Sequence, residues 1–253
     1  MNIGLIIALV AVLLVLVIGY NVMLQYRMKT ESAKRQEAGR YVAVIDATED
    51  LIGNAHHLPY SKDLLVCLNT RILDALEAMA ELDPKNKQLK SRIANMNAQI
   101  EQLKENFKDE TANFRNPSSD KQAIVMLKLV KRLRETIRSE HNKGRFDTQA
   151  YVAENARLEQ IQIRINIENV IKRANDSVMR GQAGTAKQLL KKGLEALTTK
   201  NDAYSTQAKE KLQQMLDELE QKRMDKDAAA MQELEDKERS DDMEALFGNK
   251  KKW

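Results

Sequence analysis

The feature that most constrains this chain is an uncharged stretch near its amino terminus, residues 3–24. The stretch reads IGLIIALVAVLLVLVIGYNVML and contains no acidic or basic side chain. About twenty helical residues are enough to cross the hydrocarbon core of a bilayer. The sequence therefore predicts a transmembrane anchor over residues 1–26, to which the rest of the chain is attached.

Two other interpretations of this stretch fit its flanks less well. A cleaved secretory signal would need a basic segment before the apolar run and small residues after it, whereas only Asn2 precedes the run and bulky polar residues follow. A buried core helix is rarely apolar on all faces over such a length. Tyr20 and Tyr26 fall at the far end, where amphipathic aromatic side chains lie at headgroup level. We therefore favour an uncleaved anchor.

The charges around the stretch predict its orientation. The following basic residues crowd its carboxyl side: Arg27, Lys29, Lys34, Arg35 and Arg40. Because basic residues are retained on the cytoplasmic side, we expect the amino terminus outside a plasma (inner) membrane and the bulk of the chain in the cytoplasm. The same residues could rest against anionic headgroups.

The composition predicts helices rather than sheet. Only three prolines and nine glycines interrupt 253 residues, aromatic residues make up 4% and charged residues 31%. These values are typical of a helical bundle or coiled coil with a thin aliphatic core. The single cysteine, Cys67, excludes an intramolecular disulfide and suits a reducing cytoplasm. Its apolar neighbours favour a buried, inert thiol over a reactive one.

Breaks in the helical pattern divide the chain into five segments. We predict an anchor (1–26), a membrane-proximal stalk and turn (27–60), a bundle or coiled-coil domain (61–219), a charged helical spacer (220–239) and a docking peptide (240–253). The expected fold is all-α: one transmembrane helix followed by a cytoplasmic antiparallel helical bundle.

The clearest coiled-coil pattern lies in the helix expected after Lys85. Its apolar residues alternate spacings of four and three: Leu89, Ile93, Met96, Ile100, Leu103 and Phe107. Such a seam needs a partner helix. That helix could be a neighbour in the same chain or a second copy, so the seam also predicts a possible homo-oligomer.

The next predicted helix, ending near Glu140, carries a basic face opposite its apolar one. The basic residues are Lys128, Lys131, Arg132, Arg134 and Arg138, with Lys143 and Arg145 just beyond. They form a possible anion-binding stripe, but a solvated helix face has the same appearance. Because no aromatic side chains are interleaved for base stacking, we regard nucleic acid as an unlikely partner. A nucleic-acid-associated membrane protein using residues 128–145 is the alternative function.

One later segment alternates like a strand but is flanked by long helical sequence. Isoleucines at 161, 163, 165 and 167 alternate with polar residues, and we still predict a helix from Thr148 to about Val178. Small or apolar residues then fall at Ala174, Gly181, Ala186, Leu190 and Gly193. This arrangement resembles a tetratricopeptide (TPR) helix pair, and AELDPKN at residues 80–86 resembles the close of such a repeat. The resemblance implies peptide binding in a groove, whereas any α-hairpin needs small residues at its crossing.

The carboxyl-terminal residues 240–253 combine a capping serine, an acidic first turn, spaced apolar side chains and a basic tail. The predicted partner-binding residues are Met243, Leu246, Phe247 and Trp253. Residues 240–247 resemble the response-regulator-docking peptide at the amino terminus of the flagellar switch protein, although Met243 and Glu244 stand where that peptide has Ile and Asp. The resemblance implies binding of a receiver-like or polar-machinery protein. A frayed terminus is the competing interpretation.

The sequence contains no pattern that predicts catalysis, a cofactor or a metal. It has no phosphate-binding glycine loop, nucleophile elbow, paired-cysteine zinc site or HExxH helix. His56 and His57 are adjacent, and His141 is distant in the sequence. We therefore expect a non-enzymatic bacterial-type scaffold or adaptor that recruits a soluble partner, with polar, chemotaxis, flagellar or cell-division machinery as the candidate processes. Septum-ring anchors and polar organisers share this layout.

Overall fold

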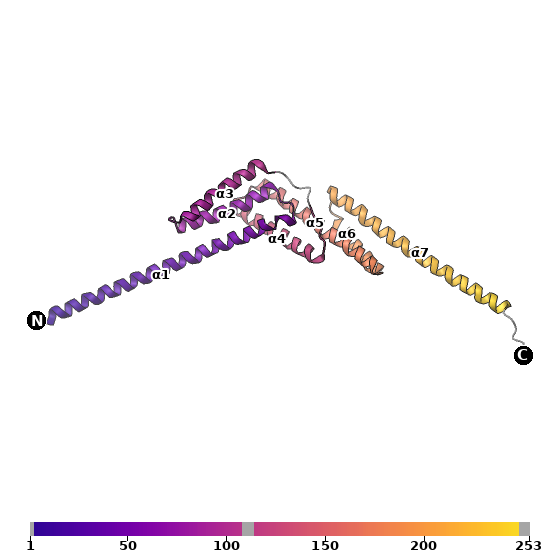
Figure 1. Cartoon of the computed structure of the whole chain (residues 1–253), viewed down its shortest axis with the longest axis horizontal. Coiled ribbons are helices and arrows are strands. Elements are labelled where there is room, and N and C mark those ends of the chain that lie inside the picture. The colour runs from indigo at the N-terminus through magenta and orange to yellow at the C-terminus, as the bar shows by residue number, and fades with distance from the viewer. Residues whose placement is uncertain (1–2, 108–113, 248–253) are drawn as a thin grey trace. The chain divides into compact units, whose positions relative to one another are not determined.

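The computed structural model describes residues 3–107 and 114–247 (Figure 1). Within these ranges the side chains of residues 3–12, 15, 240–242 and 244–247 are not described. Regular structure in the described ranges is entirely helical, which confirms the predicted all-α class. The isoleucine alternation at residues 161–167 lies inside a helix, as expected from its flanks.

Seven α-helices and one 3-10 helix follow one another along the described residues (Figure 1). In chain order they are α1 (Ile3–Gly53), the 3-10 helix η1 (Asn54–His57), α2 (Lys62–Leu82), α3 (Lys87–Asn106), α4 (Asp120–Asn142), α5 (Thr148–Met179), α6 (Ala183–Leu197) and α7 (Ala203–Phe247).

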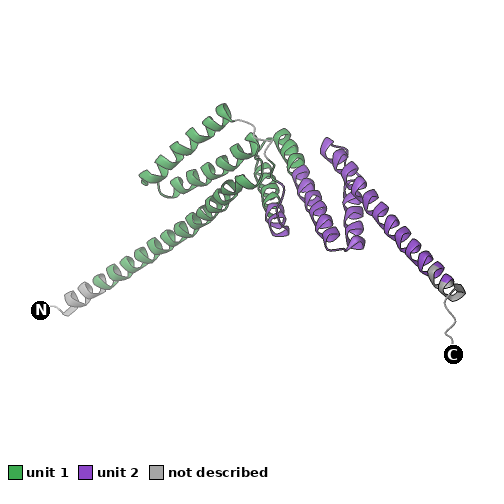
Figure 2. Ribbon diagram, turned by 45° about the vertical axis from the view of Figure 1, so that its right-hand side comes forward, with its two compact units in different colours: residues 1–115, 128–158 green, residues 116–127, 159–253 purple. Residues whose placement is uncertain are grey.

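The helices form two compact units, which Figure 2 shows in different colours. Unit 1 contains residues 1–115 and 128–158, and unit 2 contains residues 116–127 and 159–253. Helices α4 and α5 therefore each contribute to both units. The sequence predicts residues 61–219 as one bundle, whereas the structure divides this segment between the two units.

In unit 1, α2 packs between α1 and α3. Helix α2 begins after Ser61, whose Oγ accepts a hydrogen bond from the Leu64 backbone N–H at 3.1 Å. This cap satisfies one of the amide groups that lack a partner in the first turn. The buried face of the helix then repeats every three or four residues: Leu64, Cys67, Leu68, Ile72, Ala75 and Leu76.

The second half of α1 belongs to the core of unit 1 rather than to a free stalk. Ile45, Thr48 and Leu51 are 1–3% exposed, and Ile45 packs with Ile72, among others, in one apolar cluster. The Tyr60 hydroxyl donates a hydrogen bond to the Leu51 carbonyl at 2.7 Å, across the turn that follows α1. The predicted stalk of residues 27–60 therefore ends where α1 enters the core.

Unit 2 is built around an apolar cluster from α5, α6 and α7. Its buried members are Ile167, Ile171, Ala174, Ala186, Leu190, Leu197, Ala208, Leu212 and Leu216. At Gly193 an added Cβ would lie 3.1 Å from Leu212 Cδ1 and 3.2 Å from Val170 Cγ1, so this glycine permits a close approach of three helices. Gly181 is exposed and lies in the α5–α6 turn, with φ +73° in the left-handed region that favours glycine.

Helix α7 continues well beyond its packed part. Its first half contacts α6, whereas every described side chain from residue 221 onward is exposed. The helix runs without a break to Phe247. The predicted helix start at Ser240 is therefore wrong, because this serine lies inside a continuous helix. We refer to residues 221–247 as the α7 arm.

Candidate functional site

The first half of α1 exposes an apolar surface. The large apolar side chains described there are 44–69% exposed: Leu13, Leu14, Leu16, Val17, Ile18, Tyr20, Val22, Met23 and Leu24. Figure 2 shows this part of α1 extending beyond α2 and α3. The side chains of residues 3–12 and 15, which complete the predicted anchor, lie outside the described ones. In the part of the chain that was described, no helix has both the length and the apolarity of a membrane span.

Three of the four predicted partner-binding residues, Met243, Leu246 and Phe247, lie at the end of the α7 arm. Met243 is 58% exposed. The side chains of Leu246 and Phe247 are not among those described, and Trp253 lies outside the described residues. Salt bridges between side chains one helical turn apart stabilise the arm, such as the one between Arg223 and Asp227 at 3.5 Å. Its partner-binding role therefore remains a prediction.

The predicted pairing seam on α3 faces helices of the same chain. Leu89, Ile93 and Met96 pack against the cluster that α1 and α2 form around Ile72. Ile100 is 5% exposed, and Leu103 and Phe107 are half-buried. Of the two partners left open by the sequence, the structure provides the neighbouring helix.

The five predicted anion-binding residues all lie in unit 1, but part of their charge is already paired. Arg132 binds Asp50 at 2.7 Å, Lys131 lies 3.9 Å from Glu135, and the Arg134 Nε donates to Asn155 at 3.0 Å. Lys128 and Arg138 are exposed. The cationic surface is thus smaller than the sequence alone predicts.

Sequence reasoning missed a buried ionic cluster around Glu140, whose side chain is 2% exposed. Arg71 from α2 binds Glu140 and also donates to the Thr48 hydroxyl at 3.2 Å. Lys143 donates to Glu140 Oε1 at 2.9 Å, and Arg145 lies 3.8 Å from Oε2. A buried carboxylate needs such partners because desolvation of an unpaired charge is costly. The cluster joins α1, α2 and α4.

A second buried carboxylate, Glu154, ties α5 to the start of α2. It accepts a hydrogen bond from Ser61 Oγ at 2.7 Å and two from Arg157, at 2.9 and 2.6 Å. Arg157 also donates to the Pro59 carbonyl at 2.7 Å. The same serine that caps α2 therefore fixes this helix to α5.

Both buried carboxylates follow a signal in the sequence. Glu140 continues the apolar spacing of Leu133 and Ile137, and Glu154 precedes Leu158 and Ile161 at spacings of four and three. An acidic residue in register with an apolar stripe faces the core and needs a buried partner. The partner itself, such as Arg71, is distant in sequence and has no comparable signal.

Burial shifts the pKa values of several titratable side chains in unit 1. Burial, with Glu140 nearby, raises the pKa of the Cys67 thiol to about 12, so the thiolate is scarce at neutral pH. Burial also raises the pKa of the Tyr60 hydroxyl. Desolvation raises the pKa of Asp74, which Arg145 at 3.0 Å opposes. The raised pKa values of the thiol and the phenol keep both groups in their protonated, weakly nucleophilic forms at neutral pH.

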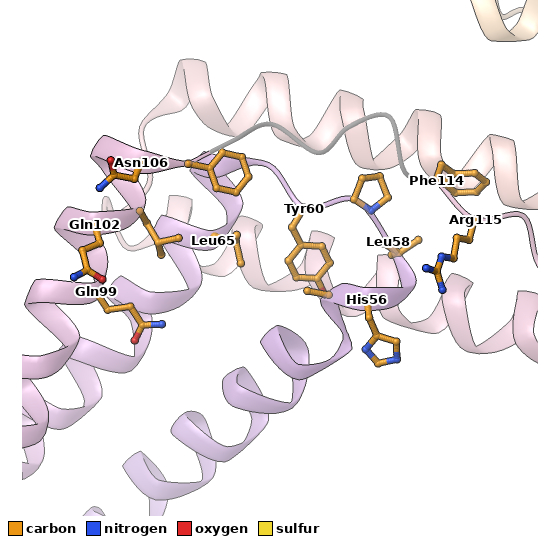
Figure 3. Close-up of a pocket in the computed structure, with 13 residues that line it drawn as sticks. His56, Leu58, Tyr60, Leu65, Gln99, Gln102, Asn106, Phe114 and Arg115 are labelled. Carbon is orange, nitrogen blue, oxygen red and sulfur yellow. The ribbon is translucent and has the colours of Figure 1, made fainter.

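A hollow of about 1020 Å³ lies in unit 1 beside the turn between α1 and α2. Figure 3 shows Gln99, Gln102 and Asn106 of α3 at one side of it and Phe114 and Arg115 at the other. Its described lining contains no carboxylate, and the phenolic hydroxyl of Tyr60 is already bonded. The described lining therefore offers amides, aromatic rings, His56 and Arg115, without a carboxylate to act with them as acid or base.

The three histidines lie in two ring pairs. The rings of His56 and His57 are tilted by 44° with their centroids 3.9 Å apart, and desolvation lowers the pKa of His57. His141 stacks on Tyr151 at 4.4 Å and its Nδ1 lies 3.1 Å from the Phe146 carbonyl oxygen. Among the described residues, no three His, Cys, Asp or Glu side chains are arranged to hold a metal ion.

Comparison of the chain with known protein families, with curated proteins and with solved structures finds no match.

Proposed function

We propose that this chain is a membrane-anchored helical adaptor, held in the inner membrane by residues 1–26 and extending into the cytoplasm, where it recruits a protein partner. The observation that carries the proposal is the exposure of consecutive apolar residues on α1. Leu16, Val17 and Ile18 are 67%, 48% and 61% exposed.

The arrangement of these side chains favours lipid over a protein groove as their cover. Successive residues of an α-helix are about 100° apart, so three consecutive exposed apolar residues point to three different sides. A groove in a partner covers one face of a helix, whereas a bilayer covers all faces. The stretch of residues 3–24 is also free of charge, which the hydrocarbon core requires.

The continuity of α1 supports a defined distance between the bilayer and unit 1. The helix runs unbroken from Ile3 to Gly53, and the first buried one among its described side chains is Ile45. At 1.5 Å per residue, Leu24 and Ile45 are about 30 Å apart along the axis. Basic residues such as Arg27 and Lys29 lie at the start of this interval, where the positive-inside rule places them on the cytoplasmic side.

The α7 arm is the segment we propose for recruitment. At 1.5 Å per residue it is about 40 Å long, and its described side chains are exposed. Residues 240–247, at its end, resemble a docking peptide for a response regulator, which favours a receiver-like or polar-machinery protein as the partner.

The experiment that tests recruitment is a pull-down from detergent-solubilised membranes with the full chain and with a version that ends at Arg239. We expect mass spectrometry to find a protein that only the full chain retains. As a matched control, Met243→Ala should reduce retention while Met224→Ala should leave it unchanged, because Met224 lies outside the docking segment. Retention of the same proteins by the shortened chain would contradict the proposal.

A further inference from the structure

A small polar cavity lies in unit 1 where α1, α2 and α4 meet. Its volume is about 240 Å³, below the range of about 300–1,000 Å³ that is usual for pockets of drug-sized ligands. The cavity therefore has room for a small ion with a few waters. The polar side chains that line its described part are Thr48 of α1, Arg71 of α2, and Arg132, Glu135, Thr136 and Ser139 of α4.

The four residues from α4 lie on one face of that helix. Residues 132 and 136, and residues 135 and 139, are each four apart, and residues 132 and 135 are three apart. Arg132 belongs to the anion-binding stripe predicted from the sequence, whereas Arg71 comes from α2 and was not part of it. The cavity therefore combines guanidinium groups from two helices.

The guanidinium of Arg71 is fixed at one side of the cavity. The Arg71 side chain is 18% exposed; its Nη1 binds Glu140 and its Nε donates to Thr48 Oγ1 at 3.2 Å. The Thr48 hydroxyl is itself held by the Val44 carbonyl at 2.7 Å. A guanidinium has five N–H donors, and among the described residues Nη2 has no acceptor. A group fixed in this way loses little freedom when it binds a ligand.

The side chains of α4 add further donors. Arg132 Nη1 binds Asp50 at 2.7 Å, which leaves its Nε and Nη2 without an acceptor in the described part of the chain. The hydroxyls of Thr136 and Ser139 are half-buried, and no described side chain or carbonyl bonds to them. Two guanidinium groups and two hydroxyls therefore present hydrogen-bond donors around one small space. A tetrahedral oxyanion has acceptors for all of them.

We infer that this cavity binds a protonated phosphate group, supplied by inorganic phosphate or by a small phosphate monoester. The arginine forks and the hydroxyls donate to its unprotonated oxygens, and the Glu135 carboxylate accepts the hydrogen bond of its P–O–H group. Glu135 is bound only loosely in its own helix, with Lys131 at 3.9 Å. A free cation would be repelled by the two arginines.

Glu135 makes the site selective among anions. A phosphate group loses its second proton near pH 6, so at that pH a large share of it still carries a hydrogen-bond donor. Sulfate has no proton there and would bring its negative oxygens against the Glu135 carboxylate. We therefore expect the cavity to prefer phosphate to sulfate, which a surface that attracts anions by charge alone would not do.

The acidic partners of the two arginines limit the affinity. Glu140 and Asp50 balance much of the charge of Arg71 and Arg132, so hydrogen bonds rather than net charge must hold the ion. We expect a dissociation constant of about 1 mM. The inference does not depend on the membrane anchor or on the docking segment.

The test is titration calorimetry of the full chain, purified in mild detergent at pH 6, with phosphate and with sulfate at equal ionic strength. We expect saturable binding of phosphate and at least about tenfold weaker binding of sulfate. Glycerol 3-phosphate tests the source: binding of both phosphates identifies the terminal group of a monoester, and binding of inorganic phosphate alone identifies the free ion. Equal binding of phosphate and sulfate, or no saturation by either phosphate up to about 10 mM, would overturn the inference.

Substitutions in α4 separate the cavity from general charge. Arg132→Gln should weaken phosphate binding about tenfold, whereas Arg138→Gln, which removes the same charge from an exposed position outside the described lining, should change it less than about twofold. Glu135→Gln should bring sulfate binding to within about threefold of phosphate binding. Hydrogen exchange of α4 checks that each variant is folded. Equal losses in Arg132→Gln and Arg138→Gln would show that the ion does not bind in the cavity.

Discussion

The two compact units bury different kinds of side chain. The buried polar residues of unit 1 are Thr48, Asn69, Glu140 and Glu154, and the carboxylates among them bind side chains from distant elements. In unit 2 the buried polar residues are Ser177 and Ser205, which bond within their own turn of helix, to Arg173 and Asp202. Unit 1 therefore combines apolar packing with buried long-range ionic contacts, whereas the long-range ion pairs of unit 2, such as Lys187 with Glu220 at 2.8 Å, are partly exposed.

This difference determines how each unit should respond to substitution. Removing one member of a buried ion pair leaves a charge without a partner, which is far more damaging than losing an exposed pair. Removing methylene groups from an apolar cluster leaves a cavity. Hydrogen exchange read by mass spectrometry reports protection helix by helix, so it assigns each loss to one unit.

The largest effect is expected for Arg71→Ala in unit 1. Glu140 would remain buried with weaker partners, and we expect a loss of roughly 3–5 kcal/mol in the protection of α2 and α4. The matched control is Arg92→Ala, which removes a pair with Glu49 of 2.5 Å whose side chains are 47% and 48% exposed, and should cost less than about 1 kcal/mol. Equal effects of the two substitutions would refute the ionic account of unit 1.

Replacing both Arg71 and Glu140 tests whether the loss in Arg71→Ala comes from the unpaired charge of Glu140. Arg71→Met combined with Glu140→Leu leaves no buried charge on these two residues, so we expect most of the protection lost in Arg71→Ala to return. If the double variant is as unstable as the single one, then Lys143, Arg145 and the packing around them depend on the Glu140 carboxylate.

In unit 2 the largest expected effect comes from the cluster itself. Leu190 is fully buried, and Leu190→Ala should reduce the protection of α6 by about 3 kcal/mol while leaving α2 unchanged. Leu234→Ala, on the exposed α7 arm, should change the protection by less than about 0.5 kcal/mol. A loss of protection in α2 upon Leu190→Ala would show that the two units are not energetically separate.

Alanine substitution of two glycines in α6 should give smaller changes in stability, and the two changes should have opposite signs. Gly193→Ala brings a Cβ to 3.1 Å from Leu212 and should cost about 1–3 kcal/mol, because the cluster must shift. Gly184→Ala meets nothing within 4 Å and should stabilise α6 by up to about 1 kcal/mol. Stabilisation by both substitutions would mean that the close approach at Gly193 is easily relaxed.

The smallest effect is a pH dependence in unit 1. Desolvation raises the pKa of Asp74 in the folded state, so the folded state binds its proton more tightly than the unfolded state does. The stability contributed by the protonated form is present at low pH and is lost as the pH rises through the raised pKa. The protection of α2 should therefore fall as the pH rises above about 4, and Asp74→Asn should remove the part of this fall that Asp74 causes. An unchanged pH profile would exclude Asp74 as its source.

The amphipathic helices could be predicted from the sequence because their apolar spacing is local information. The faces containing Ile72 and Leu76 in α2, and Met126, Val130 and Leu133 in α4, follow directly from spacings of three and four. The strand-like isoleucines were also assigned correctly, because long helical flanks outweigh a short alternating pattern.

The features that could not be predicted depend on contacts between distant residues. The partner of the α3 seam could have been another chain, and only the packing around Ile72 identifies a neighbouring helix. Ser240 has the chemistry of a helix cap, but the preceding turns are strong helix formers and carry the helix through it. The sequence does not predict that α1 enters the core of unit 1 at Ile45, because the apolar residues in this part of the helix are irregularly spaced.

The measurement that tests the central claim most directly is extraction of membranes from cells that express the full chain or a version beginning at Arg27. The account predicts that the full chain stays in the membrane pellet after alkaline carbonate treatment and that the shortened chain is released into the supernatant, because residues 3–24 supply the anchor. Release of the full chain by carbonate would contradict the account, and the exposed apolar side chains of α1 would then require a protein partner.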